Sequence, residues 1–506
     1  MLFVVALGVY GLESVAWPLS AGRDLRTYLL FYEQMWGWHA LLPAVQLIRT
    51  PVAPLVTGVT LDLGGGWLAM VVMAVLYAGS IVAWATVALV FGRRAALLTA
   101  LALLVYPSYG ALFHELSSDA VYAAGFALWA LLLVRAAGAP SAGRFALLGL
   151  GTALIALTRP GNQLLVVFAL LPLFLRAAWR QRLVWVGACL LPAVVCLGGW
   201  AGLNDLRYSD FTVAGNASEL PFYRGFVVDR IISPGNGPAS RQLAQAVERY
   251  LLPSQPYRSY GIDLKRFFSS GSTRMSVDLI SLSDRIWGWH SNILERVSIE
   301  AIQTHLGRYL RGVATTVWDL LRFPVYGPRA TNSSTATPLR RATIVVNGHR
   351  VPKPTEGEPI PDSHQSNRLS TPDNRIRVTW TSPNRNHIVF RNPHDQHRYR
   401  TLVATVNRVS RTLPTYAANP TLLLRLNQVS HRYPWPVIWL GAGLLGVIIR
   451  RPRNASIALA IAAAALLVII STALGLPAVA EYAAPVAPAL ILLGAVGTLG
   501  QRPARS

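Results

Sequence analysis

The sequence has few charged residues for its length, and one basic residue type is nearly absent. Only 14% of the 506 residues are charged, against roughly 25% in an ordinary soluble domain, while 53% are hydrophobic. Lysine occurs only at Lys265 and Lys353, which we interpret as the codon usage of a bacterium with GC-rich DNA. With a mean hydropathy of +0.39, the apolar residues must collect where they escape water. This composition excludes an ordinary soluble protein.

Cysteine is scarce, and the first ten residues carry no charge. Cys189 and Cys196 are the only cysteines, and the helix between them would separate them by about 10 Å, which is too far for a disulfide. We expect both to be packing residues. A cleaved signal peptide would need a basic segment before its apolar core. Residues 1–10 lack one, so we interpret them as part of a first membrane span.

Uncharged apolar segments recur along the chain. A helix needs about 20 apolar residues to cross a hydrocarbon core about 30 Å thick, and several segments approach that length. The candidate spans are residues 2–17, 67–91, 95–108, 120–134, 145–157, 164–175, 183–203, 434–449, 455–474 and 483–499. We therefore predict an all-α polytopic membrane protein with a bundle of about ten helices.

A long polar insertion separates the first seven spans from the last three. We predict a membrane module at 1–203 that includes interfacial helices, a basic extracytoplasmic domain at 204–433, and a second membrane module at 434–506.

The insertion itself is predicted to be mixed α/β. Helical periodicity covers residues 240–252 and 284–321, and residues 375–381 and 387–391 alternate like the strands of a hairpin. Residues 326–374 are rich in Pro, Ser, Thr, Asn and Gly, so we expect long loops or partial disorder there.

The placement of arginine predicts the topology, because basic residues near span ends favour the cytoplasm. One set of short loops and the C-terminus holds twelve basic residues and no acidic one: Arg93, Arg94, Arg135, Arg144, Arg176, Arg180, Arg182, Arg450, Arg451, Arg453, Arg502 and Arg505. The short loops on the other side hold four basic and seven acidic residues, and the insertion holds 30 basic and 16 acidic residues. The net charge of +23 is therefore not the pattern of a nucleic-acid-binding protein.

The first outer loop, PLSAGRDLRTYLLFYEQMWGW, places ionisable residues directly before an amphipathic run. Leu25, Tyr28, Leu29, Tyr32 and Trp36 recur at three- and four-residue spacing, which predicts a helix lying in the membrane interface. Arg23 and Asp24 precede this helix. Asp24 is either its N-terminal cap or an active-site acid.

Three further outer segments carry candidate site residues. His114, Glu115 and Asp119 lie between the third and fourth spans, and Asp119 is either a helix cap or an active-site acid. Arg159 is the only charge in the turn between the fifth and sixth spans. It either holds a phosphate through paired hydrogen bonds or extends toward lipid headgroups.

Glu481 and Tyr482 complete the set at the start of the last span. Ionisable groups at a membrane boundary are energetically costly, so their convergence on one face predicts a functional site.

These motifs resemble those of the GT-C superfamily of membrane glycosyltransferases, in particular the protein mannosyltransferases and the lipid A aminoarabinose transferases. The segment GRDLRTYLLFYEQMW resembles their first-loop motif, TPVAPLVTGVTLDLGG their second juxtamembrane segment, and RRAALLTALALLVYPSYGALFHELSSDAVYAA their third and fourth spans with a second acidic motif. ALTRPGNQLLV is similar to the turn after span five, and EYAAPVAPALILL to the start of a late span. The resemblance covers residues 1–203 well, the insertion weakly and the last spans in part.

The resemblance implies transfer of one sugar, with inversion, from a polyprenyl-phosphate donor to a hydroxyl of a glycan, lipid or protein. It places the reaction at the extracytoplasmic face of a bacterial inner membrane. Asp24 and Asp119 are the expected catalytic residues, with Asp24 as the base. The expected substrate-binding residues are Arg23, Tyr28, His114, Glu115, Arg159, Glu481 and Tyr482, of which Arg159 or His114 would stabilise the leaving phosphate.

A divalent cation is an open question. Asp119 and Glu115 would hold it if one is used, but Leu25 stands where many relatives carry a second acid.

Other functions fit parts of the pattern. A transporter or flippase of a lipid-linked saccharide would place charged groups near the bilayer midplane, whereas these acids gather at the outer boundary. A noncatalytic anchor for the basic domain would leave the acids in the short loops unexplained. A polysaccharide polymerase or ligase also uses lipid-linked donors, but usually relies on Arg and His pairs.

Overall fold

The computed structural model describes residues 1–22, 24–215, 219–288, 291–322, 342–346, 348–354, 360, 371, 375–382, 385–413 and 419–501. In this part of the chain helices dominate, with three small two-stranded sheets. All ten predicted spans are helical: α1 (Leu2–Ala16), α4 (Val52–Leu89), α5 (Arg93–Leu104), α7 (Ser118–Gly138), α8 (Ala142–Ala156), η1 (Pro160–Phe174), α9 (Trp179–Tyr208), α18 (Pro436–Arg450), α19 (Ala455–Gly475) and α21 (Ala487–Leu499).

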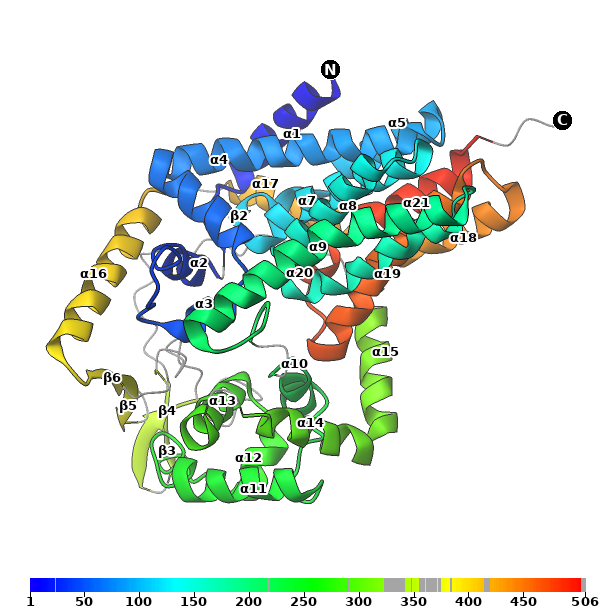
Figure 1. Cartoon of the computed structure of the whole chain (residues 1–506). Coiled ribbons are helices and arrows are strands. Elements are labelled where there is room, and N and C mark those ends of the chain that lie inside the picture. Colours follow the sequence, from blue (N-terminus) through cyan, green and yellow to red (C-terminus); the bar gives the residue numbers. More distant parts are fainter. Residues whose placement is uncertain are drawn as a thin grey trace.

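These helices form one bundle (Figure 1). By length and composition, α4, α7, α9, α19 and the run Thr421–Arg450 can each cross a membrane, and α1, α8, η1 and α21 are shorter apolar helices. The predicted all-α, multi-pass membrane fold is therefore confirmed.

Glycines let several helices of the bundle approach closely. A Cβ built at Gly149 of α8 would overlap the backbone of Cys189 in α9. A Cβ at Gly446 of α18 would likewise overlap Gly497 of α21, and one at Gly443 would meet Leu493. Small residues at such crossings are typical of membrane helices, whose association depends on van der Waals packing between backbones.

The arginine-rich connections meet at one end of the bundle. The amide of Gln501, after α21, donates to the carbonyl of Phe91 in the α4–α5 turn at 2.9 Å. The amide of Arg453, between α18 and α19, donates to the Gln501 carbonyl at 2.8 Å. Three basic segments are thereby joined at the end opposite the insertion (Figure 1).

Short elements cover the other end: α2 (Leu25–Tyr32), α3 (Pro43–Leu47), α6 (Pro107–Leu112) and α20 (Ala480–Ala483). Strand β1 (Ser20–Ala21) pairs in parallel with β2 (Glu115–Leu116), and Ser20 stands opposite Glu115. The first loop is therefore tied to the segment that leads into α7. Helix α4 kinks at Gly65, whose φ of 61° is in the left-handed region that favours glycine. The kink separates the juxtamembrane part of α4 from its membrane part.

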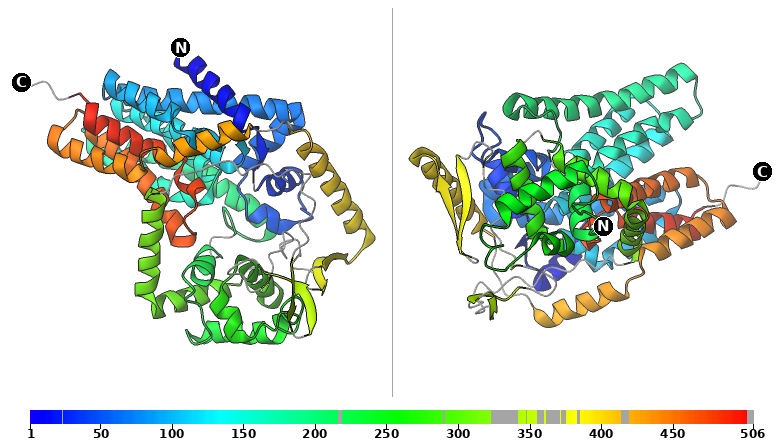
Figure 2. Two further views of the ribbon diagram at one scale, coloured as in Figure 1. Left: turned by 180° about the vertical axis from the view of Figure 1, so that it is seen from behind. Right: turned by 90° about the horizontal axis from the view of Figure 1, so that it is seen from below.

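The insertion contains a second hydrophobic core, built from residues between 222 and 360. Its helices are α10 (Glu219–Tyr223), η2 (Arg224–Val228), α11 (Pro238–Ala246), η3 (Val247–Leu251), α12 (Leu264–Ser270), α13 (Thr273–Trp287), α14 (Ile293–Thr304) and α15 (Leu306–Arg322). The helix predicted at 240–252 is formed by α11 and η3, whereas the one predicted at 284–321 is divided among α13, α14 and α15. Figure 2 shows α15 running from the insertion to the bundle.

Two hairpins complete the insertion. Strands β5 (Ile376–Ser382) and β6 (Arg385–Phe390) pair antiparallel, which confirms the predicted hairpin. Strands β3 (Thr343–Val346) and β4 (His349–Pro352) lie where loops were predicted, and much of 326–374 is outside the described residues.

Two more helices follow the hairpins: α16 (Pro393–Ser410) contacts α2 and α4, and α17 (Pro420–Arg432) contacts α1 and α6. The division at 204 and 433 stays a prediction.

A buried arginine attaches the insertion to the bundle. The Arg224 Nε donates to the Asp229 carboxylate at 2.8 Å, and its Nη1 donates to the Leu476 carbonyl at 3.1 Å and to the Ala473 carbonyl. The Tyr309 hydroxyl donates to the Leu474 carbonyl at 2.9 Å. These donors satisfy carbonyls at the C-terminal end of α19 that have no partner within the helix. The insertion is therefore held against the C-terminal end of α19.

Candidate active site

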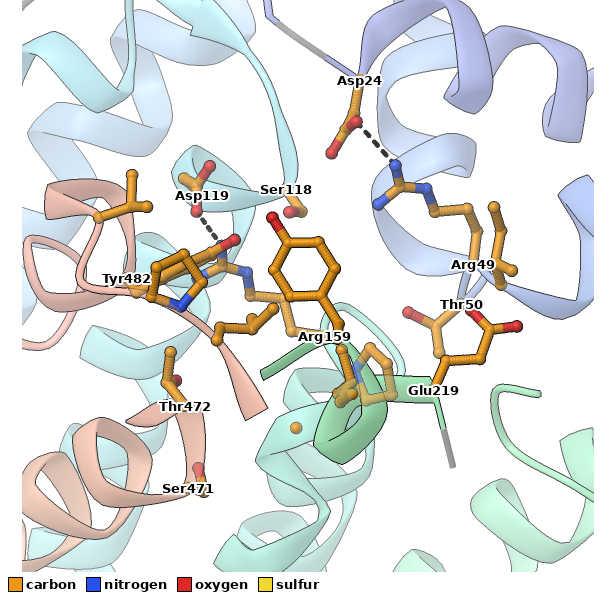
Figure 3. Close-up of a pocket in the computed structure, with 18 of the residues that line it drawn as sticks. Asp24, Arg49, Thr50, Ser118, Asp119, Arg159, Glu219, Ser471, Thr472 and Tyr482 are labelled. Atoms are coloured by element: carbon orange, nitrogen blue, oxygen red, sulfur yellow. Dashed lines mark ion pairs between the residues drawn. The ribbon is translucent and has the colours of Figure 1, made fainter. Parts of the chain in front are cut away.

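A cavity of about 720 Å³ lies between the insertion and the end of the bundle that faces it (Figure 3). The first membrane module contributes Asp24, Tyr28, Arg49, Thr50, Ser118, Asp119, Thr158, Arg159 and Asn162. The C-terminal spans contribute Ser471, Thr472 and Tyr482, and the insertion contributes Glu219, Tyr223, Thr273, Arg274 and Asp278. Polar side chains from distant parts of the sequence therefore face one space.

Asp24 enters this cavity paired with Arg49. Their carboxylate and guanidinium groups are 2.7 Å apart, and the Arg49 guanidinium also lies 5.1 Å from the centre of the Tyr28 ring. Asp24 occupies the N-cap position of α2, but its side chain makes no capping hydrogen bond. The interpretation of Asp24 as a helix cap is therefore wrong, because the carboxylate turns to the arginine instead of the helix amides.

Asp119 forms the second ion pair of the cavity, with Arg159 at 2.5 Å. The N-cap of α7 is Ser117, whose hydroxyl accepts a hydrogen bond from the backbone amide of Asp119 at 3.2 Å. The interpretation of Asp119 as the helix cap is therefore also wrong. Arg159 lies 5.6 Å from the ring of Tyr122 and 5.3 Å from that of Tyr482. Its guanidinium points into the cavity, which excludes the alternative that it extends toward lipid headgroups.

Tyr28 links the two ion pairs. Its ring is buried beside Arg49, and it lines the cavity together with Ser118, the neighbour of Asp119. Burial raises the pKa of Tyr28 above its usual value, and the nearby Arg49 opposes part of the shift. Tyr28 therefore lines the cavity as a neutral phenol.

Three predicted site residues do not line the cavity. His114 is fully buried, stacks on Tyr10 with ring centres 4.2 Å apart, and lies 3.6 Å from the Glu13 carboxylate. Glu115 and Glu481 are buried close enough to Asp119 to add negative charge around it. These two acids therefore influence the cavity through their charge alone.

The remaining predicted residue, Arg23, lies outside the described residues. Several polar lining residues were not predicted from the sequence, among them Arg49, Thr50, Thr158, Asn162, Ser471, Thr472 and residues of the insertion. Arg49 was available as one of the four basic residues of the outer loops. Glu219, Tyr223, Thr273 and the neighbouring lining residues of α13 carry no motif, so only the fold of the insertion identifies them.

The carboxylates that were expected to hold a divalent cation do not make a suitable donor set. Asp24 and Asp119 are each neutralised by an arginine, and Glu115 does not line the cavity. No group of three or more His, Cys, Asp or Glu side chains arranged for a metal occurs within the described residues. We therefore derive no step through a metal ion.

Comparison with known proteins identifies the class of protein. Residues 49–200, which include α4 through most of α9, match the family model described as "Dolichyl-phosphate-mannose-protein mannosyltransferase". The match covers less than half of the chain and supports a GT-C-type membrane glycosyltransferase. This finding confirms the predicted enzyme class and favours it over the transporter and anchor alternatives. No curated protein matches the chain significantly.

Two solved structures resemble this glycosyltransferase distantly. One is ArnT from Cupriavidus metallidurans bound to undecaprenyl phosphate, with a TM-score of 0.32 and 17% identity, covering 65% of this chain and 82% of that chain. The other is the same protein in the apo state, with a TM-score of 0.33 and 14% identity, covering 98% of this chain and 76% of that chain.

Proposed function

We propose that this glycosyltransferase moves a single sugar from a polyprenyl-phosphate donor to an acceptor hydroxyl, with inversion, at the extracytoplasmic face of a bacterial inner membrane. The observation that carries the proposal is one cavity at the bundle's outer end that holds Asp24, Asp119 and their two arginines. A lipid donor explains why these groups lie at the ends of membrane helices, since its tail stays in the bilayer.

The residues divide naturally between the two halves of the reaction. The acceptor hydroxyl gives its proton to the Asp24 carboxylate as its oxygen bonds to the anomeric carbon of the donor. The bond from that carbon to the phosphate oxygen breaks, and the phosphate leaves with the electron pair. Arg159 and Arg49 are the cations in the cavity that stabilise this growing charge.

Asp119 keeps Arg159 in place through the 2.5 Å contact, so we assign it the role of orienting the phosphate-binding side chain. Arg49 forms the corresponding ion pair with Asp24. When the Asp24 carboxylate takes the proton of the acceptor hydroxyl, the Arg49 guanidinium can donate its hydrogen bonds to the phosphate instead. His114, which was expected to share the phosphate, is buried outside the cavity, so this role passes to Arg49.

The orientation rests on charge. The arginine-rich connections lie at the bundle end opposite the cavity, and such loops favour the cytoplasm. The cavity and the insertion then face outward, where lipid-linked sugar donors meet envelope acceptors.

Purified protein incubated with a panel of polyprenyl-phosphate sugars, together with an extract of envelope glycans, lipids and proteins as acceptors, tests the proposal. We expect one donor to release polyprenyl phosphate, and Asp24→Asn to lower the rate at least about a hundredfold with the fold intact. Asp62→Asn is the matched control, because Asp62 is an exposed outer acid that does not line the cavity. Equal rates for Asp24→Asn and the wild type would contradict the assigned base, and release from no donor would contradict the function.

A further inference from the structure

The insertion forms one wall of the cavity. Glu219 and Tyr223 lie on α10, and Thr273 begins α13, with its hydroxyl 3.1 Å from that of Tyr223. Arg274, which follows Thr273, and Asp278, one turn further along α13, are buried with their charged groups 3.9 Å apart. Figure 3 shows Glu219 facing the same space as the two ion pairs of the membrane module. We call Glu219, Tyr223 and Thr273 the outer wall.

The charge of the cavity disfavours an anionic acceptor. Its described lining contains four carboxylates (Asp24, Asp119, Glu219 and Asp278) and three arginines (Arg49, Arg159 and Arg274), with no lysine or histidine. Each arginine already lies near a carboxylate, and two further buried acids stand behind Asp119. The donor phosphate would add more negative charge and occupy the arginines. A second phosphate or carboxylate would therefore enter against repulsion.

The local structure also disfavours an extended peptide. Peptide segments commonly bind by adding a strand to the free edge of a sheet. The described lining residues belong to helices and loops, and none belongs to a strand. Inside a helix the backbone amides and carbonyls are hydrogen-bonded to each other. This wall therefore offers side chains for recognition and few free backbone groups.

We propose that the outer wall binds a neutral oligosaccharide as the acceptor. Sugar hydroxyls would donate to the Glu219 carboxylate and exchange hydrogen bonds with the hydroxyls of Tyr223 and Thr273, while the Tyr223 ring covers an apolar sugar face. The inference rests on the proposed function in one respect, that the reacting hydroxyl reaches Asp24 across the same cavity.

Equilibrium binding tests this proposal without turnover. The full chain carrying Asp24→Asn, in lipid nanodiscs, is titrated with mannotriose, galactotriose and arabinotriose and with the monophosphate of each, using saturation-transfer NMR. We expect at least one neutral trisaccharide to bind saturably and about tenfold more tightly than its phosphate. Absence of binding by all neutral trisaccharides, or preference for the phosphates, would overturn the proposal.

Substitutions locate the binding on the outer wall. Tyr223→Phe combined with Thr273→Val removes two hydroxyls, and we expect about tenfold weaker binding of the neutral sugar. Tyr250→Phe combined with Thr315→Val is the matched control, since both residues are exposed elsewhere on the insertion. Equal effects of the two double variants, or no effect of either, would overturn the assignment.

Glu219→Gln separates charge from shape. We expect it to narrow the preference for neutral over phosphorylated trisaccharide, because one negative charge leaves the wall. An unchanged ratio would overturn the charge argument, and tighter binding of a serine-containing decapeptide than of any trisaccharide would assign the wall to protein acceptors. If wild-type protein releases no polyprenyl phosphate yet binds the neutral sugar, the proposed function fails and the binding proposal stands.

Discussion

The guanidinium of Arg49 lies 2.7 Å from the carboxylate of Asp24, which turns an expected helix cap into half of an ion pair. The pair places a cation and a proton acceptor side by side at the membrane boundary. A reaction that removes a proton from a hydroxyl and releases a phosphate needs both.

Arg49→Ala should lower the transfer rate by about a hundredfold or more, because it removes donors that stabilise the leaving phosphate. Arg49→Lys should recover only part of the rate, since an ammonium cannot reproduce paired guanidinium contacts. The measurement is the steady-state release of polyprenyl phosphate. Arg26→Ala, on the exposed face of α2, is the control. Wild-type rates in Arg49→Ala would remove Arg49 from the mechanism.

Arg159→Gln should destabilise the protein more than Asp119→Asn combined with Arg159→Gln. The single change leaves the Asp119 carboxylate, 9% exposed, without its partner, and breaking such a pair costs about 3 kcal/mol. Thermal unfolding in detergent measures the difference. Both variants should be inactive. If the double variant recovers stability but not activity, the contribution of the ion pair to stability is separate from the contribution of Arg159 to catalysis. Equal melting temperatures would show that the pair is not coupled.

Asp284 should make the stability of the insertion depend on pH. Burial, together with the charge of Glu219, raises the pKa of Asp284 from 3.8 to about 7. Because the folded state binds this proton more tightly than the unfolded state, stability is highest at low pH and falls as pH rises from about 4 through 7. Asp284→Asn should remove this dependence. Melting temperatures measured between pH 5 and 8 test it, and parallel curves for the variant and the wild type would contradict it.

Gly446→Val should destabilise the C-terminal membrane module, since a side chain there overlaps the backbone of α21 at Gly497. Gly441→Val lies on the same helix with nothing within 4 Å of its added Cβ, so it should be close to neutral. Overpacking of this kind costs about 1–3 kcal/mol. Thermal unfolding of the two variants in the same detergent compares them, and equal losses would place the α18–α21 contact elsewhere.

Most of the bundle was predictable because a membrane span is a local property. Twenty or so apolar residues without charge form a helix wherever they occur, so α4, α7, α9 and α19 follow from composition. The hairpin of β5 and β6 follows from alternation in the same way. The loops predicted for 326–374 include a hairpin, β3–β4, whose four-residue strands are too short to stand out in a polar segment.

The candidate site was predictable only in part. Asp24, Tyr28, Asp119, Arg159 and Tyr482, which were selected from the ends of predicted spans, line one cavity, and their roles stay a prediction. His114 lies shortly before Asp119 in the chain, but its side chain is buried in the core against Tyr10. Position along the chain places a residue at a boundary without giving the direction of its side chain.

The sequence by itself determined that this chain crosses a membrane several times and which ionisable residues gather at one face, because hydrophobicity and charge act residue by residue. Tertiary structure decided which acid meets which arginine. The two-residue pairing of β1 with β2 brings Asp24 near Asp119. Arg224 holds the insertion against α19, so that Tyr223 lines the same cavity as these two acids. These contacts join residues far apart in the chain, and their geometry depends on the packing of the whole bundle.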